Sequence, residues 1–150
     1  MSAENKVIAR RVREEIWNNG LFSMVDQLFD AHCTYHLGDS LTTEHEIGPQ
    51  GFKDIVAMYR AAFPDARMTI NDLLAEGDKV MVRWTAHGTH LGQLLNFVPT
   101  RKVVTVSGID VYRIFNGKIE ETWVSWDALG FLQQLGVIPA IERTRFQVAS

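Results

Sequence analysis

The strongest candidate for chemistry in this sequence is an aspartate inside a long alternating segment. Residues 103–115 are typical of one β-strand, whose side chains point alternately to two faces. One face carries Asp110 among the apolar or small residues Val104, Val106, Gly108, Tyr112 and Ile114. A carboxylate in apolar surroundings is costly to ionise, and a carboxyl group that keeps its proton near neutral pH suits general acid–base catalysis. We therefore place Asp110 first among the catalytic candidates. The structural alternative is a buried aspartate bonded to a neighbouring strand, a backbone amide or an arginine.

A second carboxylate stands at the start of the last helical pattern. Asp127 follows Trp123 and Trp126 and precedes Ala128, where a helix is expected to begin. Aspartate is a favoured N-cap residue, because its side chain accepts hydrogen bonds from the first free backbone N–H groups. Asp127 is therefore a catalytic candidate with a strong structural alternative.

Five histidines raise the question of a metal site. His32 and His36 have the spacing of a helical ligand pair, but the surrounding residues favour a strand. Four residues of strand span about 13 Å, too far for two ligands to share one ion. His87 and His90 have no cysteine nearby, so we predict no metal. His36 is instead assigned as a polar group at a pocket mouth that orients a substrate carbonyl.

These candidates must be positioned by helices that come first and strands that come later. Residues 5–18 place Ile8, Val12 and Ile16 on one helical stripe, a second short helix follows, and residues 49–63 form the clearest helix. Strands are expected over residues 33–37, 67–75, 80–87, 103–115 and 118–126, with a hairpin turn at Asn116-Gly117. A last helix is expected after Asp127. This order predicts an α+β fold, a curved antiparallel sheet with N-terminal helices packed on it, enclosing an apolar pocket.

Composition narrows the class of protein. The chain of 150 residues fits a single domain spanning 1–150, and its net charge of −3 does not suggest a nucleic-acid or anionic-membrane partner. One cysteine, a polar N-terminal segment and the lack of a long apolar run predict a cytoplasmic protein without a membrane span.

No P-loop, G-x-G-x-x-G or G-x-S-x-G motif is present. A few aromatic residues with one or two carboxylates are a common make-up for a pocket that binds a flat organic molecule.

Several motifs, taken in order, resemble the SnoaL-like polyketide cyclase family of the nuclear-transport-factor-like superfamily. They are Gly48-Pro49-Gln50-Gly51-Phe52-Lys53 with Tyr59 to Asp65, Gly77-Asp78-Lys79-Val80 to Gly92, Gly108-Ile109-Asp110 to Ile119, and Trp126-Asp127-Ala128-Leu129-Gly130 to Gly136. The resemblance spans roughly residues 5–137. It implies a cone-shaped α+β fold with a deep apolar pocket, a homo-oligomer of two or more subunits, and cofactor-free ring closure by intramolecular aldol condensation.

The resemblance also implies where catalytic groups lie. The acid/base aspartate of the cyclases falls at or near Val124, a pocket histidine falls near Asp110, and a second aspartate matches Asp127. Since valine cannot transfer protons, Asp110 or Asp127 would take that role, and we expect Asp110→Asn to abolish turnover without disturbing the fold. The residues expected to bind the substrate, a small apolar or aromatic carbonyl-rich molecule, are Tyr35, Tyr59, Trp84, Trp123 and Val124.

Two alternatives stay open at this point. The missing carboxylate at Val124 also suits a non-catalytic module that binds an apolar metabolite. A cofactor-free hydroxylase or an isomerase could use the same scaffold.

Overall fold

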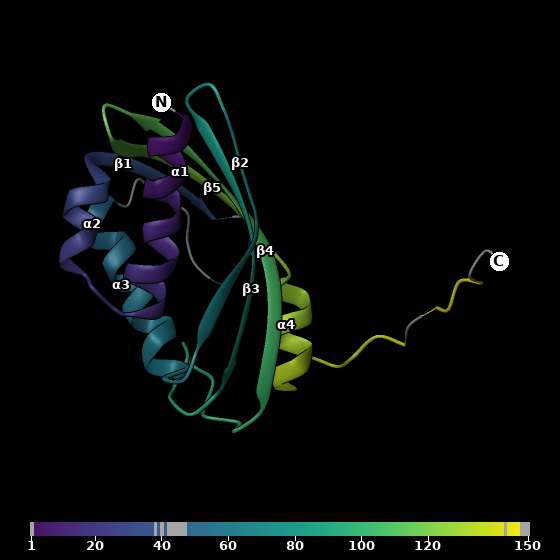
Figure 1. The fold of residues 1–150 in the computed structure, drawn as a ribbon. Helices are drawn as coiled ribbons and strands as arrows, with labels where there is room; N and C mark the ends of the chain where they lie inside the picture. The colour runs from purple at the N-terminus through teal and green to yellow at the C-terminus, as the bar shows by residue number, and fades with distance from the viewer. Residues whose placement is uncertain (1, 38, 40, 42–47, 143, 148–150) are drawn as a thin grey trace.

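Among the described residues, four helical segments precede the last four strands of a five-stranded sheet, and one helix follows it (Figure 1). The computed structural model describes residues 2–37, 39, 41, 48–142 and 144–147. In chain order the elements are α1 (Ser2–Arg11), the π-helical segment η1 (Val12–Asn18), α2 (Ser23–Leu28), β1 (Phe29–Leu37), α3 (Gly48–Ala62), β2 (Arg67–Glu76), β3 (Lys79–Thr89), β4 (Val103–Phe115), β5 (Lys118–Trp126) and α4 (Ala128–Leu135). The predicted α+β class is confirmed.

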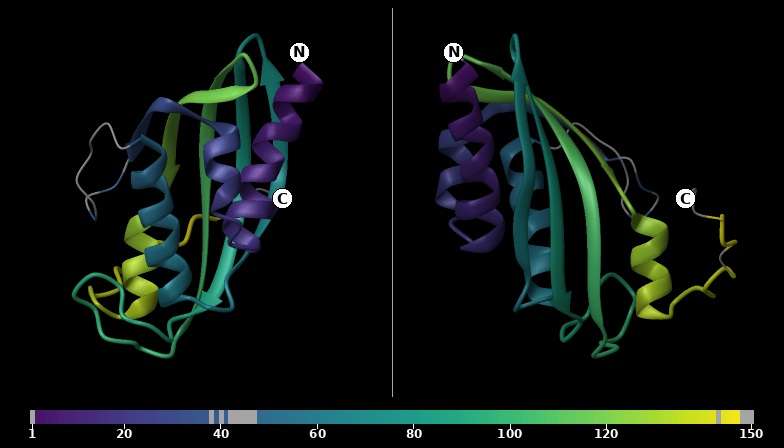
Figure 2. Two further views of the ribbon diagram at one scale, coloured as in Figure 1. Left: turned by 90° about the vertical axis from the view of Figure 1, so that its left-hand side faces the viewer. Right: turned by 45° about the vertical axis from the view of Figure 1, so that its right-hand side comes forward.

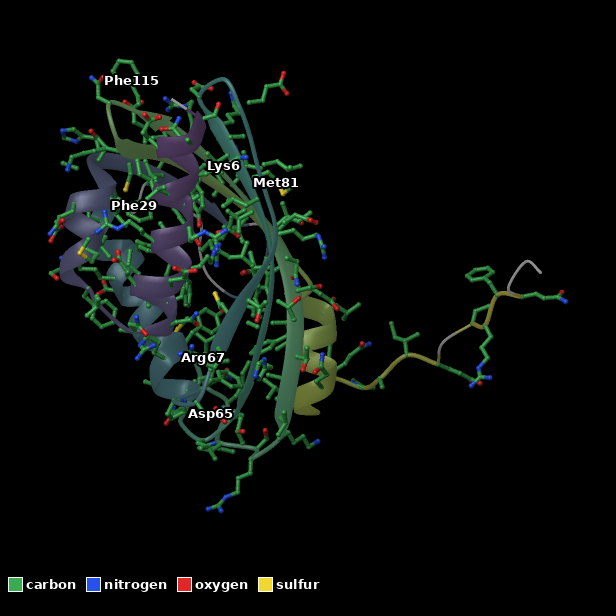
Figure 3. All side chains as sticks on the ribbon, in the orientation of Figure 1. Lys6, Phe29, Asp65, Arg67, Met81 and Phe115 are labelled. Atoms are coloured by element: carbon green, nitrogen blue, oxygen red, sulfur yellow. The ribbon has the colours of Figure 1, made fainter. Side chains whose placement is uncertain are left out.

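The sheet is curved, with α1, α2 and α3 on its concave side and α4 beside the lower part of β4 (Figures 1 and 2). Its strand order is β1-β5-β4-β3-β2. Phe29 of β1 and Phe52 of α3 meet with ring centroids 4.6 Å apart, and Val80 and Val82 of β3 belong to the same buried cluster. The core therefore fills the space between the helices and the concave face. Met81, between those two valines in sequence, points to the opposite side of the sheet (Figure 3).

One strand pair differs from the predicted antiparallel sheet. Strands β2 to β5 pair antiparallel, as the hairpin signals indicate, but β1 runs parallel to β5. Parallel neighbours require a long crossover, and here α3 and strands β2 to β4 separate the two partners in the chain. The short-range turn signals of the sequence contain no information on this pairing. β1 also begins at Phe29, four residues before the strand expected over residues 33–37.

The predicted turn between β4 and β5 is confirmed in detail. Asn116 has φ 51° and Gly117 has φ 76°. Positive φ at both central residues defines a type I′ turn, which asparagine followed by glycine adopts most readily. The turn pairs Ile114 with Ile119, and a β-bulge at Glu120 then shifts the register by one residue, which places Asp110 opposite Val124 on β5.

Gly108 is required by a neighbouring aromatic ring. It pairs with Trp84 on β3, and a Cβ atom at position 108 would lie 2.5 Å from Cζ2 of Trp84 and 2.7 Å from Cβ of Trp126. These contacts show that the missing side chain of Gly108 leaves room for the indole.

Gly108→Ala is therefore expected to displace the Trp84 ring and to destabilise the protein by about 1–3 kcal/mol, the usual cost of overpacking. Thermal unfolding followed by circular dichroism measures this effect. Gly117→Ala is a control for the general cost of removing a glycine, because a Cβ atom there meets nothing within 4 Å and only its positive φ is strained. An unchanged melting temperature in Gly108→Ala would show that the ring can move freely.

Helix α4 covers part of the edge of β4 that β5 leaves open. The side-chain amide of Gln134 donates to the carbonyl oxygen of Thr105 and accepts from its N–H, both at 2.8 Å. Asp127 begins the helix, where its side chain accepts a hydrogen bond from the Gly130 N–H at 2.9 Å, and Gly136 with φ 77° ends it. The helix thereby satisfies strand groups that would otherwise stay unpaired.

Candidate active site

A pocket with a cavity volume of about 110 Å³ lies between the helices and the concave face of the sheet. Its wall is largely apolar, with contributions from α3, β1, the concave faces of β3, β4 and β5, and Phe131 of α4. Few of the lining side chains are polar, and two of these, Asp110 and Arg13, are each 1% exposed. An apolar pocket with a few fixed polar groups is the usual form of a small-molecule site.

Asp110 is held by three donors from three different elements. The Trp84 indole N–H donates to Oδ1 at 2.9 Å, and the Tyr112 hydroxyl donates to Oδ2 at 3.1 Å. The Arg13 guanidinium forms an ion pair with the same Oδ2 atom, and its Nη2 atom also donates to the Tyr112 hydroxyl at 3.0 Å. The sequence analysis considered an arginine partner as the structural alternative for Asp110. The structure shows this partner and also places Asp110 in the pocket wall.

Arg13 is the site residue that the sequence analysis missed. Its side chain is 2% exposed, and its Cζ atom lies 5.2 Å from the centre of the Trp84 ring. Burial lowers the pKa of this guanidinium. The charge of Asp110 and the nearby tyrosines together raise this pKa by more, so the net shift is upward. Arg13 therefore stays charged. The signal in the sequence was a charged residue within the apolar stripe that includes Val12 and Ile16.

The π-helical segment η1 places both Arg13 and Trp17 in the pocket wall. Arg13 lies four residues after the buried Ala9 and three before the buried Ile16, so ordinary helical periodicity already puts it on the buried face. The wider turn of η1 brings Trp17 closer to that face than an α-helical turn would. π-Helical turns are rare, and they occur frequently at functional sites.

The geometry leaves one acceptor position on Asp110 available for chemistry. A carboxylate has about four lone-pair positions. Oδ2 accepts from Arg13 and Tyr112, whereas Oδ1 accepts only from Trp84 among the described residues. The remaining position on Oδ1 could accept a proton from a substrate in the pocket. Asp110 thus has the location of a general base and a lone-pair position that can take the proton.

Four of the five predicted substrate-binding residues line the pocket. They are Tyr35, Tyr59, Trp84 and Val124. Burial raises the pKa of the Tyr35 and Tyr59 hydroxyls above the ordinary value, so both stay protonated at neutral pH. Trp123 is not part of the wall, because it follows the opposite alternation to Val124 on β5, and it is 37% exposed.

His36 lies on the same outer face as Trp123. Its ring stacks on Trp123 with centroids 5.5 Å apart, and its Nε2 atom is 2.7 Å from Oε2 of Glu121. This hydrogen bond lowers the pKa of Glu121. Tyr35 and Leu37, its neighbours on β1, face the pocket instead. The structure therefore does not bring His36 together with Asp110, and the predicted place at a pocket mouth is not where the side chain lies.

Asp127 is also absent from the pocket wall. Its carboxylate accepts the Gly130 N–H at the start of α4, which is the N-cap alternative that the sequence allowed. Of the three catalytic candidates, Asp110 alone contributes to the pocket.

A second carboxylate in the wall was not predicted. Asp39 accepts a hydrogen bond from the Trp126 indole N–H at 2.7 Å and from the Leu41 N–H at 2.9 Å. Burial, together with the charge of Asp39, raises the pKa of Tyr59. In the mostly polar sequence of residues 38–47, nothing distinguished Asp39 from the acidic residues around it.

Neither a metal-ion cluster nor a membrane-spanning helix is found among the described residues. Over the described residues, no three histidine, cysteine, aspartate or glutamate side chains come close enough together to hold a metal ion. None of the described helices is both long and apolar enough to cross a membrane.

Known proteins resemble this chain in sequence and in structure. The sequence profile of the SnoaL-like polyketide cyclases matches residues 7–135. The nogalonic acid methyl ester cyclase of Streptomyces nogalater is 33% identical over 98 residues, which cover 63% of this chain and 73% of that enzyme.

Two solved structures extend the likeness. A candidate polyketide cyclase from Acidithiobacillus ferrooxidans superposes with a TM-score of 0.79 at 30% identity, covering 89% of this chain and 95% of the other. AclR, a candidate hydroxylase from Streptomyces galilaeus, has a TM-score of 0.82 at 23% identity, covering 95% and 87% of the two chains, and this likeness concerns the fold. On the profile match across most of its length, the chain belongs to the family of SnoaL-like polyketide cyclases.

Proposed function

We propose that this protein closes a ring in a flat, carbonyl-rich substrate by cofactor-free acid–base chemistry, with Asp110 as the acid/base residue. The observation that carries the proposal is a single one: Asp110 is buried in the wall of an apolar pocket, and its Oδ1 atom keeps an unused acceptor position. Family membership supports the reaction class.

The proposed step is an intramolecular aldol addition. Oδ1 of Asp110 takes a proton from a carbon between two carbonyl groups, which forms an enolate. The enolate carbon bonds to a second carbonyl carbon of the same molecule, and the resulting alkoxide takes the proton back from Asp110. One C–H bond and the π bond of the attacked carbonyl group break, and one C–C bond and one O–H bond form, so substrate and product are isomers. Trp84 and Tyr112 would keep the carboxylate in place throughout.

The aromatic side chains in the pocket wall favour a flat substrate. Tyr35, Tyr59, Trp84 and Trp126 line the pocket together, and Val124 gives an apolar surface opposite Asp110 in the sheet. An extended ring system would stack on such residues and would also delocalise the enolate charge. We therefore propose small aromatic or apolar molecules as ligands.

A cyclisation assay with nogalonic acid methyl ester, the compound named for the Streptomyces nogalater relative, tests the proposal. We expect a product with the mass of the substrate and a different chromatographic retention time. It should form in the presence of a metal chelator and in the absence of oxygen. A product that gains one oxygen atom only in air would indicate a hydroxylase. Tight binding without any conversion, unaffected by Asp110→Asn, would indicate the binding-module alternative.

We further propose a homo-oligomer, because the outer face of the sheet is more apolar than a solvated face needs to be. Val103 is 68% exposed and Ile109 is 41% exposed on this face. Exposed apolar patches of this kind often mark a subunit interface. Light scattering at micromolar concentration should give at least twice the monomer mass, and a monomer would contradict this.

A cytoplasmic location and the lack of a nucleic-acid partner stay predictions from the sequence.

A further inference from the structure

Two buried hydrogen-bond donors of η1 have no acceptor among the residues that the structure describes. They are the Nε–H of Arg13 and the indole Nε1–H of Trp17, and both side chains line the pocket. Buried polar groups in folded proteins are nearly always paired, since an unpaired donor costs free energy. Two such donors, four residues apart on one π-helical segment, therefore indicate an acceptor that the described part of the chain does not supply.

The segment that carries these donors is firmly anchored. Arg60 of α3 donates from Nη1 to the carbonyl oxygens of Trp17 at 2.6 Å and of Asn18 at 3.0 Å. The Asn18 side chain bonds to both the N–H and the carbonyl oxygen of Met68 on β2, at 2.7 and 3.0 Å. Such a clamp fixes the backbone of η1 before a ligand arrives, which is what an efficient binding site requires.

The shape of the guanidinium places the missing acceptor beside Asp110. In an arginine the Nε–H and one Nη2–H point to the same side as a fixed fork. Nη2 of Arg13 already binds Asp110 and Tyr112. An oxygen atom that accepts from Nε would therefore lie next to the carboxylate.

Charge selects the kind of acceptor. Arg13 and Asp110 form an ion pair whose charges cancel, and both side chains are 2% exposed. A ligand carboxylate would add an uncompensated negative charge next to Asp110 in a region of low dielectric. A carbonyl oxygen accepts the same hydrogen bonds without a full charge, and it gains partial negative charge as an enolate forms.

We propose that Arg13 Nε–H and Trp17 Nε1–H form a two-donor site for a ketone oxygen of the substrate, positioned next to Asp110. This inference rests on the proposed function for its catalytic meaning, because the site would hold the carbonyl whose neighbouring carbon loses the proton. As a binding site it stands on its own. The ligand class is an uncharged ketone on a flat apolar ring system.

The test compares two probes of the same shape, 2-tetralone and its parent hydrocarbon tetralin, with 2-naphthoate as a charged analogue. Binding to the full chain is followed by tryptophan fluorescence or calorimetry. We expect 2-tetralone to bind at least about fivefold more tightly than tetralin, the effect of one net hydrogen bond. We expect 2-naphthoate to bind less tightly than 2-tetralone.

Trp17→Phe keeps an aromatic ring but removes the N–H, so it should reduce the preference for the ketone over tetralin by about fivefold. Trp123→Phe is the matched control, because that indole lies outside the pocket wall, and it should keep the wild-type preference. If Trp17→Phe does not fold, the carbonyl stretching frequency of 2-tetralone bound to the wild type gives the same information. A shift to lower frequency than in an apolar solvent is expected.

Equal binding of ketone and hydrocarbon, no binding of either, an unchanged preference in Trp17→Phe, or an unshifted carbonyl band would each overturn the two-donor site. These outcomes can be distinguished from a failure of the proposed function. Ketone selectivity that Trp17→Phe removes, in a protein that cyclises nothing, supports the site and contradicts the cyclase. Cyclisation without ketone selectivity contradicts the site alone.

Discussion

Arg13→Met is expected to lower the free energy of unfolding by about 3–5 kcal/mol, because it leaves the Asp110 carboxylate buried without its counter-ion. Domains of this size are stable by roughly 5–15 kcal/mol, so this single change removes a large part of the total. Urea unfolding of the variant and the wild type at neutral pH measures the difference.

The double variant Arg13→Met/Asp110→Leu separates the charge effect from the loss of contacts. Removing both charges removes the free-energy cost of burying an unpaired carboxylate. The double variant should therefore be markedly more stable than Arg13→Met alone. Lys53→Met is a control for a pair at the surface, since its partner Asp26 is 62% exposed, and the loss there should be within about 1 kcal/mol. If the two single changes at Arg13 and Asp110 simply add up in the double variant, the ion pair is not the source of the cost.

Asp110→Asn is expected to reduce the rate of cyclisation by about 10²–10⁴-fold, the usual contribution of a general acid–base residue. The amide is nearly isosteric with the carboxylate but cannot take a proton from the substrate. The sequence alone suggested that this variant would keep its fold undisturbed. The ion pair now predicts a loss of stability as well, because Arg13 would keep a buried charge without a partner.

Turnover of the variant must therefore be measured at a temperature where its circular dichroism spectrum matches that of the wild type. Asp127→Asn is the matched control, since its side chain caps α4 and lies outside the pocket wall. It should keep turnover within a few-fold. Wild-type turnover in Asp110→Asn, or an equal loss in Asp127→Asn, would remove Asp110 from the mechanism.

The fold could be predicted where the signals are local. The alternation along residues 103–115 placed Asp110 on the apolar face, and the Asn116-Gly117 turn set the pairing of β4 with β5. Both signals depend on residues next to one another in the chain. The parallel pairing of β1 with β5 joins residues about 90 positions apart, such as Tyr35 and Thr122, and no local pattern encodes it.

The site was predicted less completely than the fold. Asp110 was predicted because its strand has a simple period, whereas Arg13 was not, because a charged residue on a helix is usually exposed to solvent. His36 was placed near the pocket on residue type, but strand alternation turns it to the outer face with Trp123. Asp39 could not be distinguished from its polar neighbours. Chemistry that depends on contacts between distant elements needs the three-dimensional structure.

Proton exchange on 2-tetralone in D₂O tests the central role of Asp110 most directly. The ketone has an acidic CH₂ group between its carbonyl and its aromatic ring, and proton NMR follows the exchange of that group without any need for the natural substrate. Wild type and Asp127→Asn should accelerate deuterium incorporation above the buffer rate, and folded Asp110→Asn should lose about 10²-fold or more of that acceleration. Exchange at the wild-type rate in Asp110→Asn, or no acceleration by the wild type, would contradict the assignment of Asp110 as the base.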